Sequence, residues 1–380
     1  AQIQTSFTGL PSSSHEPIAR MIWASGMIES SLRQALSPLT DEERGILLNV
    51  LPAWCGDADE GPGFAPEWAE AAKKADGNDV LKMAAKVDLD LIASTARFFT
   101  AVCDETAKAL TKVPQEELLA FSNANRSPLK VLTSMGVLMV GGIYDDTYYE
   151  DATFHIDFGG HDTYRTRCAS TVGPVSFADY NGRRSVSALL DLAGDDRYIT
   201  PDAPGCASGV MGIGVLVDLA GDDFYKAGSI SLAAGILGAG VLIDKSGDDT
   251  YYADTFAMGA GKFGMGLLAD GNGNDTYRGA KFVQGFGFVK GVGALADDYG
   301  NDIYYAGGKY LHIPLLPTNY QSLSQGFGFG MRGLEASGGV GILADGFGND
   351  VYTTEVYGQG SSYWFSRSEE RRVGKECRSR

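Results

Sequence analysis

A motif of the form Asp-x-x-Gly-(Asp/Asn)-Asp-x-Tyr recurs along the second half of this 380-residue chain and constrains its fold more than any other feature. Copies occupy residues 191–198, 218–225, 244–251, 270–277, 297–304 and 345–352, and an earlier copy at 157–164 has His161 at the Asp/Asn position. From copy to copy the leading aspartate advances by 34, 27, 26, 26, 27 and 48 residues. A step that stays near 26 indicates one structural unit stacked repeatedly on itself.

A second pattern, Gly-x-Gly-x-Leu-x-Asp, leads into the motif at residues 212–218, 238–244, 264–270, 291–297 and 339–345. Its period of two is the period of a β-strand. One face carries the glycines and the leucine, and the other carries apolar residues such as Ile213, Val215 and Val217. Two bare or apolar faces predict a buried parallel strand. We expect the bare positions to admit another layer closely, and Gly194 and its equivalents to supply a positive φ.

Each unit holds two further extended stretches, one around the tyrosine and one rich in Gly and aromatic residues, as at 284–288. Glycine at this density argues against helices, because each one costs roughly 1 kcal/mol relative to Ala. The sequence therefore predicts an α+β, mainly β fold. We expect a parallel β-helix or β-solenoid of about seven coils of 26–27 residues, with an N-terminal α-helical domain.

The domain organisation follows from the change in composition near residue 130. Residues 1–12 are an N-terminal extension, 13–130 an α-helical capping domain and 131–366 the repeat domain. Helical periodicity predicts helices over 14–36, from 41 to just before Pro52, from 78 or 79 to about 112, and from Pro114 onward. We expect four or five helices that pack against the first coil and cover its unpaired strand edges. Residues 131–148 look like a degenerate first coil, with Gly141 at the leading-aspartate position.

The last 14 residues, 367–380, resemble a translated sequencing adapter. The composition changes abruptly from Tyr363-Trp364-Phe365 to a basic run. We interpret these residues as an artefactual tail and exclude them from functional reasoning, with a genuine basic tail as the alternative. On this interpretation the natural chain continues beyond Phe365, and the final coil, incomplete after Gly360, would be finished there.

Stacking turns each repeated aspartate into a column of carboxylates about 4.8 Å apart. Two like charges at that distance repel by about 1 kcal/mol in water and about 3–4 kcal/mol at an effective dielectric of 20. Backbone N–H groups two or three residues on can compensate by forming Asx-type turns. Ca²⁺, which takes six to eight oxygen ligands, can compensate as well, and both interpretations stay open. The candidate ligands are Asp191, Asp195, Asp196, Asp218, Asp222, Asp223, Asp244, Asp248, Asp249, Asp270, Asn274, Asp275, Asp297, Asn301, Asp302, Asp345, Asn349 and Asp350.

The Gly-Asn-Asp-x-Tyr turns at residues 273–277 and 300–304 distantly resemble those of the repeats-in-toxin family of secreted Ca²⁺-binding solenoids. That family repeats Gly-Gly-x-Gly-x-Asp every nine residues. Here the leading glycine pair is absent and the period is about three times longer. The resemblance covers only the turns, so it suggests rather than implies Ca²⁺ as the cofactor. We expect an extracellular or periplasmic, cell-surface location.

The composition of the chain limits which kinds of partner it can bind. The formal net charge is −17, and it becomes −20 without the tail, which carries six Lys/Arg and three Glu. Such an acidic chain is a poor nucleic-acid binder and suits cations. No run of 18 apolar residues is present, so we expect no transmembrane segment. Cys55 with Cys103 and Cys168 with Cys206 could form disulfides, or all four could be free thiols; Cys377 lies in the tail.

Conventional catalytic signatures are missing, and the balance of the signals is against an enzyme. Two departures from the repeat are the candidates for a site. An insertion of about 21 residues starts at Lys309, and its first part, residues 309–320, contains Lys309 and His312. Near the first coil lie Arg165, Arg167, Arg183 and Arg184, for which we favour pairing with the Asp ladders over clamping an anionic sugar.

We predict a secreted or cell-surface bacterial structural or adhesive protein, with polysaccharide or cell-surface components as partners. The alternative is a carbohydrate-active enzyme of the polysaccharide lyase, hydrolase or epimerase type, with Lys309, His312, Arg183 and Arg184 as candidate catalytic residues. This alternative rests on analogy with other parallel β-helices. A flat Gly/Thr face that binds an ordered surface such as ice is a third possibility, but the regular Thr ladder it would need is missing.

Overall fold

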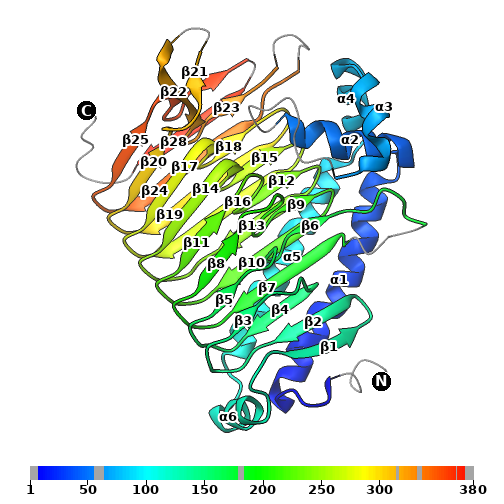
Figure 1. Ribbon diagram of the computed structural model, residues 1–380, viewed down its shortest axis with the longest axis vertical. Helices are drawn as coiled ribbons and strands as arrows, with labels where there is room; N and C mark the ends of the chain where they lie inside the picture. Colours follow the sequence, from blue (N-terminus) through cyan, green and yellow to red (C-terminus); the bar gives the residue numbers. More distant parts are fainter. Residues whose placement is uncertain are drawn as a thin grey trace.

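The chain forms an N-terminal helical region followed by parallel strands in stacked sheets (Figure 1). The computed structural model describes residues 7–54, 64–178, 184–313, 316–331, 336–364 and 366–372. The helices in this part are η2 (Ser12–Ser14), α1 (His15–Leu36), α2 (Asp41–Ala53), η3 (Pro66–Trp68), α3 (Ala69–Lys74), α4 (Gly77–Ala84), α5 (Leu89–Leu110) and α6 (Gln115–Ala124).

Local capping explains where the helices begin and end. Thr40 and Glu43 form a capping box at the start of α2, which extends one residue past Pro52 rather than ending before it. The single helix expected from residue 78 to about 112 is two helices, α4 and α5. The Asp88 carboxylate accepts a hydrogen bond from the Leu91 N–H, so that a new helix starts there.

Three large sheets contain most of the strands. Sheet A has the order β1 (Leu129–Thr133), β2 (Gly136–Val140), β4 (Phe154–Asp157), β7 (Val186–Asp191), β10 (Ile213–Asp218), β13 (Ala239–Ile243), β16 (Met265–Asn272), β19 (Val292–Tyr299), β24 (Val340–Phe347), β28 (Arg367–Arg372). Sheet B has the order β25 (Val351–Thr354), β20 (Ile303–Ala306), β17 (Thr276–Val283), β14 (Thr250–Ala257), β11 (Phe224–Ala227), β8 (Arg197–Thr200), β5 (Thr163–Tyr164), β3 (Thr147–Tyr148). Sheet C has the order β27 (Ser362–Tyr363), β23 (Gly328–Phe329), β18 (Phe286–Gly287), β15 (Ala260–Lys262), β12 (Ala234–Ile236), β9 (Gly209–Val210), β6 (Thr171–Val172).

The chain visits sheets A, B and C in turn, as in β10, β11 and β12, and we call one such passage a repeat unit. Neighbouring units pair in parallel and in motif register, so Asp218 lies beside Asp191 and Tyr225 beside Tyr198. The strands are antiparallel at the β1–β2 hairpin, which precedes the first unit, and at the inserted β21–β22 hairpin.

The glycines of the Gly-x-Gly-x-Leu-x-Asp strands face the inside of the unit, where sheet C approaches closely. A Cβ on Gly214 would lie 2.1 Å from the Ala169 carbonyl oxygen, and one on Gly240 would lie 2.5 Å from that of Ala207. The close approach expected from the bare positions is therefore present.

The outer face of sheet A is buried only where helices cover it. Helix α5 contacts β7, β10 and β13, and every residue of β7 and β10 is buried. In β16, β19 and β24, which lie beyond these helix contacts, buried inner residues alternate with less buried outer ones. The helices thus lie mainly along sheet A rather than over the first unit, and α6 lies near β3 at that end (Figure 1).

A buried lysine helps to dock the helical region on the sheets. Lys262 in β15 is completely buried, and its Nζ donates to the Leu51 carbonyl oxygen of α2 at 2.9 Å. The same ammonium group lies 4.7 Å from the ring centroid of Phe288 and 5.4 Å from that of Phe256. The aromatic rings and the carbonyl replace water around a charge that would otherwise be costly to bury.

The expected insertion contributes to a fourth, three-stranded sheet. Strands β21 (Leu311–His312) and β22 (Leu316–Ser324) make a hairpin, and β22 pairs in parallel with β26 (Val356–Gly358). Beyond it, residues 367–372, interpreted from sequence as an artefactual tail, pair with β24 at the edge of sheet A.

Candidate functional site

A column of stacked tyrosines runs through the interior of the repeat units. Adjacent ring centroids are 4.5–4.9 Å apart and the ring planes lie within 7° of parallel. The column is Tyr148, Tyr164, Tyr198, Tyr225, Tyr251, Tyr277, Tyr304 and Tyr352. Parallel pairing at the strand spacing explains this face-to-face geometry, since identical side chains then repeat at every strand.

The hydroxyls from Tyr148 to Tyr277 reach the leading aspartate of the next unit, whereas Tyr304 and Tyr352 bond to the leading aspartate of their own unit. The leading aspartates are Asp157, Asp191, Asp218, Asp244, Asp270, Asp297 and Asp345, and none is more than 3% exposed. From Tyr164 to Tyr277 the O–H to carboxylate distances to the next unit are 2.6–2.8 Å. The distances to the tyrosine's own unit are longer, 3.0–3.4 Å. Because a hydroxyl has one proton, we infer that it donates mainly to the next unit and ties adjacent units together.

The first three leading aspartates also form the expected Asx turns. Their Oδ1 atoms accept the backbone N–H two residues on, from Gly159 at 2.9 Å, Ala193 at 3.3 Å and Ala220 at 3.2 Å. At Asp270, Asp297 and Asp345 the strand continues beyond the aspartate, as in β16, and Oδ1 has no hydrogen-bond partner within the described chain.

The sixth position of the motif forms a second buried column. These closing aspartates are Asp146, Asp162, Asp196, Asp223, Asp249, Asp275, Asp302 and Asp350. Each Oδ1 from Asp196 to Asp350 accepts the backbone N–H of the closing aspartate one unit earlier, at 2.5–3.1 Å. Each Oδ2 from Asp162 to Asp302 is buried without a hydrogen-bond partner in the described residues.

The Asp/Asn position forms a third column on the exposed side of the turn. Its members are Asp145, His161, Asp195, Asp222, Asp248, Asn274, Asn301 and Asn349. Each side chain accepts the backbone N–H of the next member, as from Asp222 to Asp195 at 3.0 Å. His161 does the same through Nδ1, which accepts from Asp195 at 2.9 Å. The position needs one acceptor atom, which Asp, Asn and neutral His all supply.

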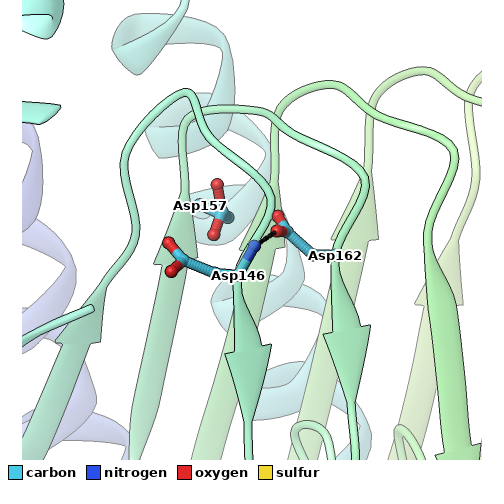
Figure 2. A group of neighbouring side chains, drawn as sticks. All are labelled: Asp146, Asp157 and Asp162. Atoms are coloured by element: carbon cyan, nitrogen blue, oxygen red, sulfur yellow. Dashed lines mark hydrogen bonds between the residues drawn. The ribbon is translucent and has the colours of Figure 1, made fainter. Parts of the chain in front are cut away.

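The structure brings the leading and closing aspartates together but leaves the middle column apart. Within the described residues, seven groups of side chains able to bind a metal have their ligand atoms within 4.8 Å of one another, and they include the triads of Asp162 with Asp191 and Asp196, and of Asp196 with Asp218 and Asp223. Figure 2 shows the first triad, in which Asp157 from sheet A faces Asp146 and Asp162 at the start of sheet B strands. The middle-column candidates Asp195, Asp222 and Asp248 are not among the members of the triads from Asp146 to Asp275. The other middle-column candidates, Asn274, Asn301 and Asn349, lie on the exposed side of the turn.

Burial raises the pKa of the closing carboxyls from Asp146 to Asp302 and so disfavours their ionisation. It raises the pKa of Asp196 to about 10, with the neighbouring Asp191 as the next cause, and that of Asp223 to about 12. The pKa of Asp275 is raised to about 7 and that of Asp302 to about 8, again mainly by burial. A buried group of three carboxylates therefore calls for a proton or a metal ion.

The donor set fits Ca²⁺ in type. Carboxylate oxygens are hard ligands, and each triad offers three of the six to eight oxygens that Ca²⁺ takes. Backbone carbonyls or water would have to supply the remainder. The unpartnered oxygens, such as Asp223 Oδ2 and Asp244 Oδ1, are the atoms free to bind an ion.

The other candidate residues are dispersed. Lys309 forms an ion pair with Asp254 at 2.7 Å, and His312 lies in β21 with its ring 5.6 Å from that of Tyr357. Arg184 donates to the Asp151 carbonyl oxygen, and burial lowers its pKa. Arg183 lies outside the described residues.

Of the arginines near the first unit, Arg167 and Arg184 have their described side-chain partners outside the aspartate columns. Arg167 forms an ion pair with Asp151 at 3.6 Å, and Asp151 belongs to none of the three columns. The expected pairing with the Asp ladders is therefore replaced by pairing with a loop residue.

The structure decides between disulfides and free thiols for three of the cysteines. Cys103, Cys168 and Cys206 are buried free thiols, so Cys168 and Cys206 do not form a disulfide here. Cys55 and Cys377 lie outside the described residues.

No family model, curated protein or solved structure matches the chain. Among the described helices, none combines the length and apolar character that crossing a bilayer requires.

Proposed function

We propose that the chain is a β-solenoid with a structural or adhesive role at the cell surface or in the extracellular or periplasmic space. Three parallel sheets visited in turn support this class of protein, as does motif register maintained across the stacked units. A stack of this kind offers long, regular outer faces, which suit contact with extended partners.

We also propose that Ca²⁺ stabilises the stack from within. The observation that carries this proposal is the recurrence, unit after unit, of buried carboxylate oxygens without a hydrogen-bond partner beside a second carboxylate. An ion bound there would be coordinated by carboxylates of adjacent units and would therefore link those units. Weak sites of this type are filled at extracellular Ca²⁺ concentrations, in agreement with the proposed location.

Thermal unfolding in EDTA and then in millimolar Ca²⁺ tests the Ca²⁺ proposal. The melting temperature is expected to rise with Ca²⁺, because a ligand that binds only the folded state stabilises it. Asp223→Asn should reduce that rise, since it replaces an unpartnered carboxylate oxygen with an amide.

Asp222→Asn is the matched control, because Asn already occupies its column at position 274 and the acceptor oxygen is kept. An unchanged melting temperature in Ca²⁺ for the wild-type chain would sink the Ca²⁺ proposal. It would leave protons on the closing aspartates as the neutralising species.

A carbohydrate-active enzyme remains the second candidate function. One observation favours it, namely that the insertion carrying Lys309 borders a hollow over sheet B that also holds Asp254 and two further cations.

A further inference from the structure

The outer face of sheet B carries an alternating column of cations and aromatic rings. The residues that directly follow the buried tyrosines point outward, because successive side chains of a strand alternate between its faces. In four successive units these residues are Lys226, Tyr252, Arg278 and Tyr305, aligned by the register of the strands. The repeated motif ends at the tyrosine, so the packing of the interior does not require cations and aromatic rings to alternate at the next position.

A hollow of about 400 Å³ follows this column. It is lined by all four residues and by Asp254 and Lys309, so its charged groups are three cations and one carboxylate. A local excess of two positive charges stands out on a chain whose net charge is −17. Four units span about 14 Å from the first to the last strand, given the spacing between neighbouring strands.

The two column cations are available to a ligand. Lys226 and Arg278 are exposed, and neither has an ion-pair partner within the described chain. The Arg278 guanidinium lies 5.0 Å from the ring centroid of Tyr305, which holds its plane against the aromatic face.

The insertion forms one wall of the hollow. Lys309 donates to the Asp254 carboxylate at 2.7 Å, and the Tyr310 hydroxyl donates to the same carboxylate at 2.9 Å. These bonds fix the end of the insertion over β14 and leave a hydroxyl, a carboxylate and an ammonium group together at the rim.

We propose that this hollow binds a linear acidic polysaccharide whose chain runs along the stacking direction. Sugar rings would pack on Tyr252 and Tyr305, while their carboxylates would meet Lys226 and Arg278. Asp254 and the hydroxyls of the rim would bond to sugar hydroxyl groups. The inference rests on the proposed adhesive role, to which it gives a ligand class, and it does not depend on Ca²⁺ binding.

An acidic sugar fits better than a nucleic acid, although both present anionic groups and stackable rings. The long-range field of a chain of charge −17 opposes both polyanions alike, so the choice between them rests on the contacts inside the hollow. The Asp254 carboxylate would oppose phosphate, whereas sugar hydroxyls can donate to it.

Calorimetric titration with hexamannuronate tests the proposal, with the uncharged mannohexaose as the matched sugar and a short oligothymidylate as the matched polyanion. The protein is the full chain at one fixed Ca²⁺ concentration. We expect hexamannuronate to bind, and mannohexaose and oligothymidylate to bind at least about tenfold more weakly.

Two pairs of variants localise the site. Arg278→Ala should weaken binding by about tenfold, whereas Arg197→Ala should change it by less than about twofold. Arg197 is also exposed on sheet B and lies 4.9 Å from the Phe224 ring, but it is not a lining residue. Tyr252→Ala should weaken binding, and Tyr299→Ala, which removes an exposed ring at the end of β19 in sheet A, should not.

Equal affinity for the neutral or the nucleotide oligomer would overturn the proposal, as would equal losses in Arg278→Ala and Arg197→Ala. Absence of binding by the folded wild-type chain would overturn it as well. The Ca²⁺-dependent melting shift is measured on the same samples, so loss of glycan binding with that shift preserved removes the glycan inference alone.

Discussion

At the scale of single residues, each position of the repeated motif has one physical task. The leading aspartate receives tyrosine hydroxyls, the closing aspartate receives a backbone N–H, and the middle residue supplies one acceptor atom. The glycine allows adjacent turns to touch. A Cβ on Gly221 would lie 1.4 Å from the Gly194 carbonyl oxygen, and φ at Gly221 is +152°.

Gly221→Ala is therefore expected to destabilise the fold by at least about 2 kcal/mol, from the backbone conformation and the clash together. Gly26→Ala in α1 is the matched control, because its Cβ would meet nothing closer than Met135 Sδ at 3.7 Å. In a helix interior that exchange should be neutral or stabilising by up to about 1 kcal/mol. Urea unfolding of both variants measures the difference, and similar midpoints for the two would refute the argument.

At the scale of elements, the same strand pattern serves two environments. Strands β7 and β10 are buried on both faces beneath helix α5, whereas β16 and β24 show an outer face to solvent. The one long insertion adds the β21–β22 hairpin and borders the hollow on sheet B.

Variants in and next to the hairpin distinguish a binding role of the hollow from a catalytic one. We expect neither Lys309→Ala nor His312→Ala to alter chain length in hexamannuronate, because the wild-type protein is expected to leave it intact. Chromatography of the oligomer after prolonged incubation measures this. Shortening by the wild-type chain that is lost in His312→Ala would favour the enzymatic alternative.

At the scale of the whole molecule, buried carboxylates lie close together in successive units. Bound protons or Ca²⁺ are needed to neutralise their negative charge. Burial raises the pKa of Asp244 to about 6, of Asp275 to about 7 and of Asp302 to about 8. Their unfolded pKa is about 3.9, so the folded state binds protons more tightly than the unfolded state does.

In EDTA the stability contributed by these protons is complete below about pH 4 and is lost as pH rises toward about 8. We therefore expect the melting temperature in EDTA to fall across that interval. With Ca²⁺ the shift relative to EDTA should grow with pH, because the metal binds the ionised carboxylates. Melting curves at several pH values in both media measure this, and a melting temperature in EDTA that rises with pH would contradict it.

The sequence by itself determined the repeat, its period and the strand type, because the glycines, leucines, aspartates and tyrosines return at fixed spacing. It also predicted a positive φ at Gly194 and its equivalents, which is confirmed at Gly194, Gly221 and Gly247 but not at Gly273, Gly300 and Gly348. The repeat and the strand type return in every unit, so each copy repeats the evidence for them.

Only the tertiary structure decided features that depend on what lies beside a unit. At one corner of three successive units the backbone is left-handed at Met211, Leu237 and Phe263. None of these residues is a glycine, so the sequence does not indicate this conformation. The sequence predicts burial on both faces for every copy of the strand, and the partly exposed outer faces of β16, β19 and β24 correct this, because none of the described helices covers them. The docking of Lys262 on α2 and the meeting of Asp254 with Lys309 across 55 residues also arise from long-range packing. The column on sheet B emerges only when strands stack, because its four members are 26 or 27 residues apart and gain their common face from register.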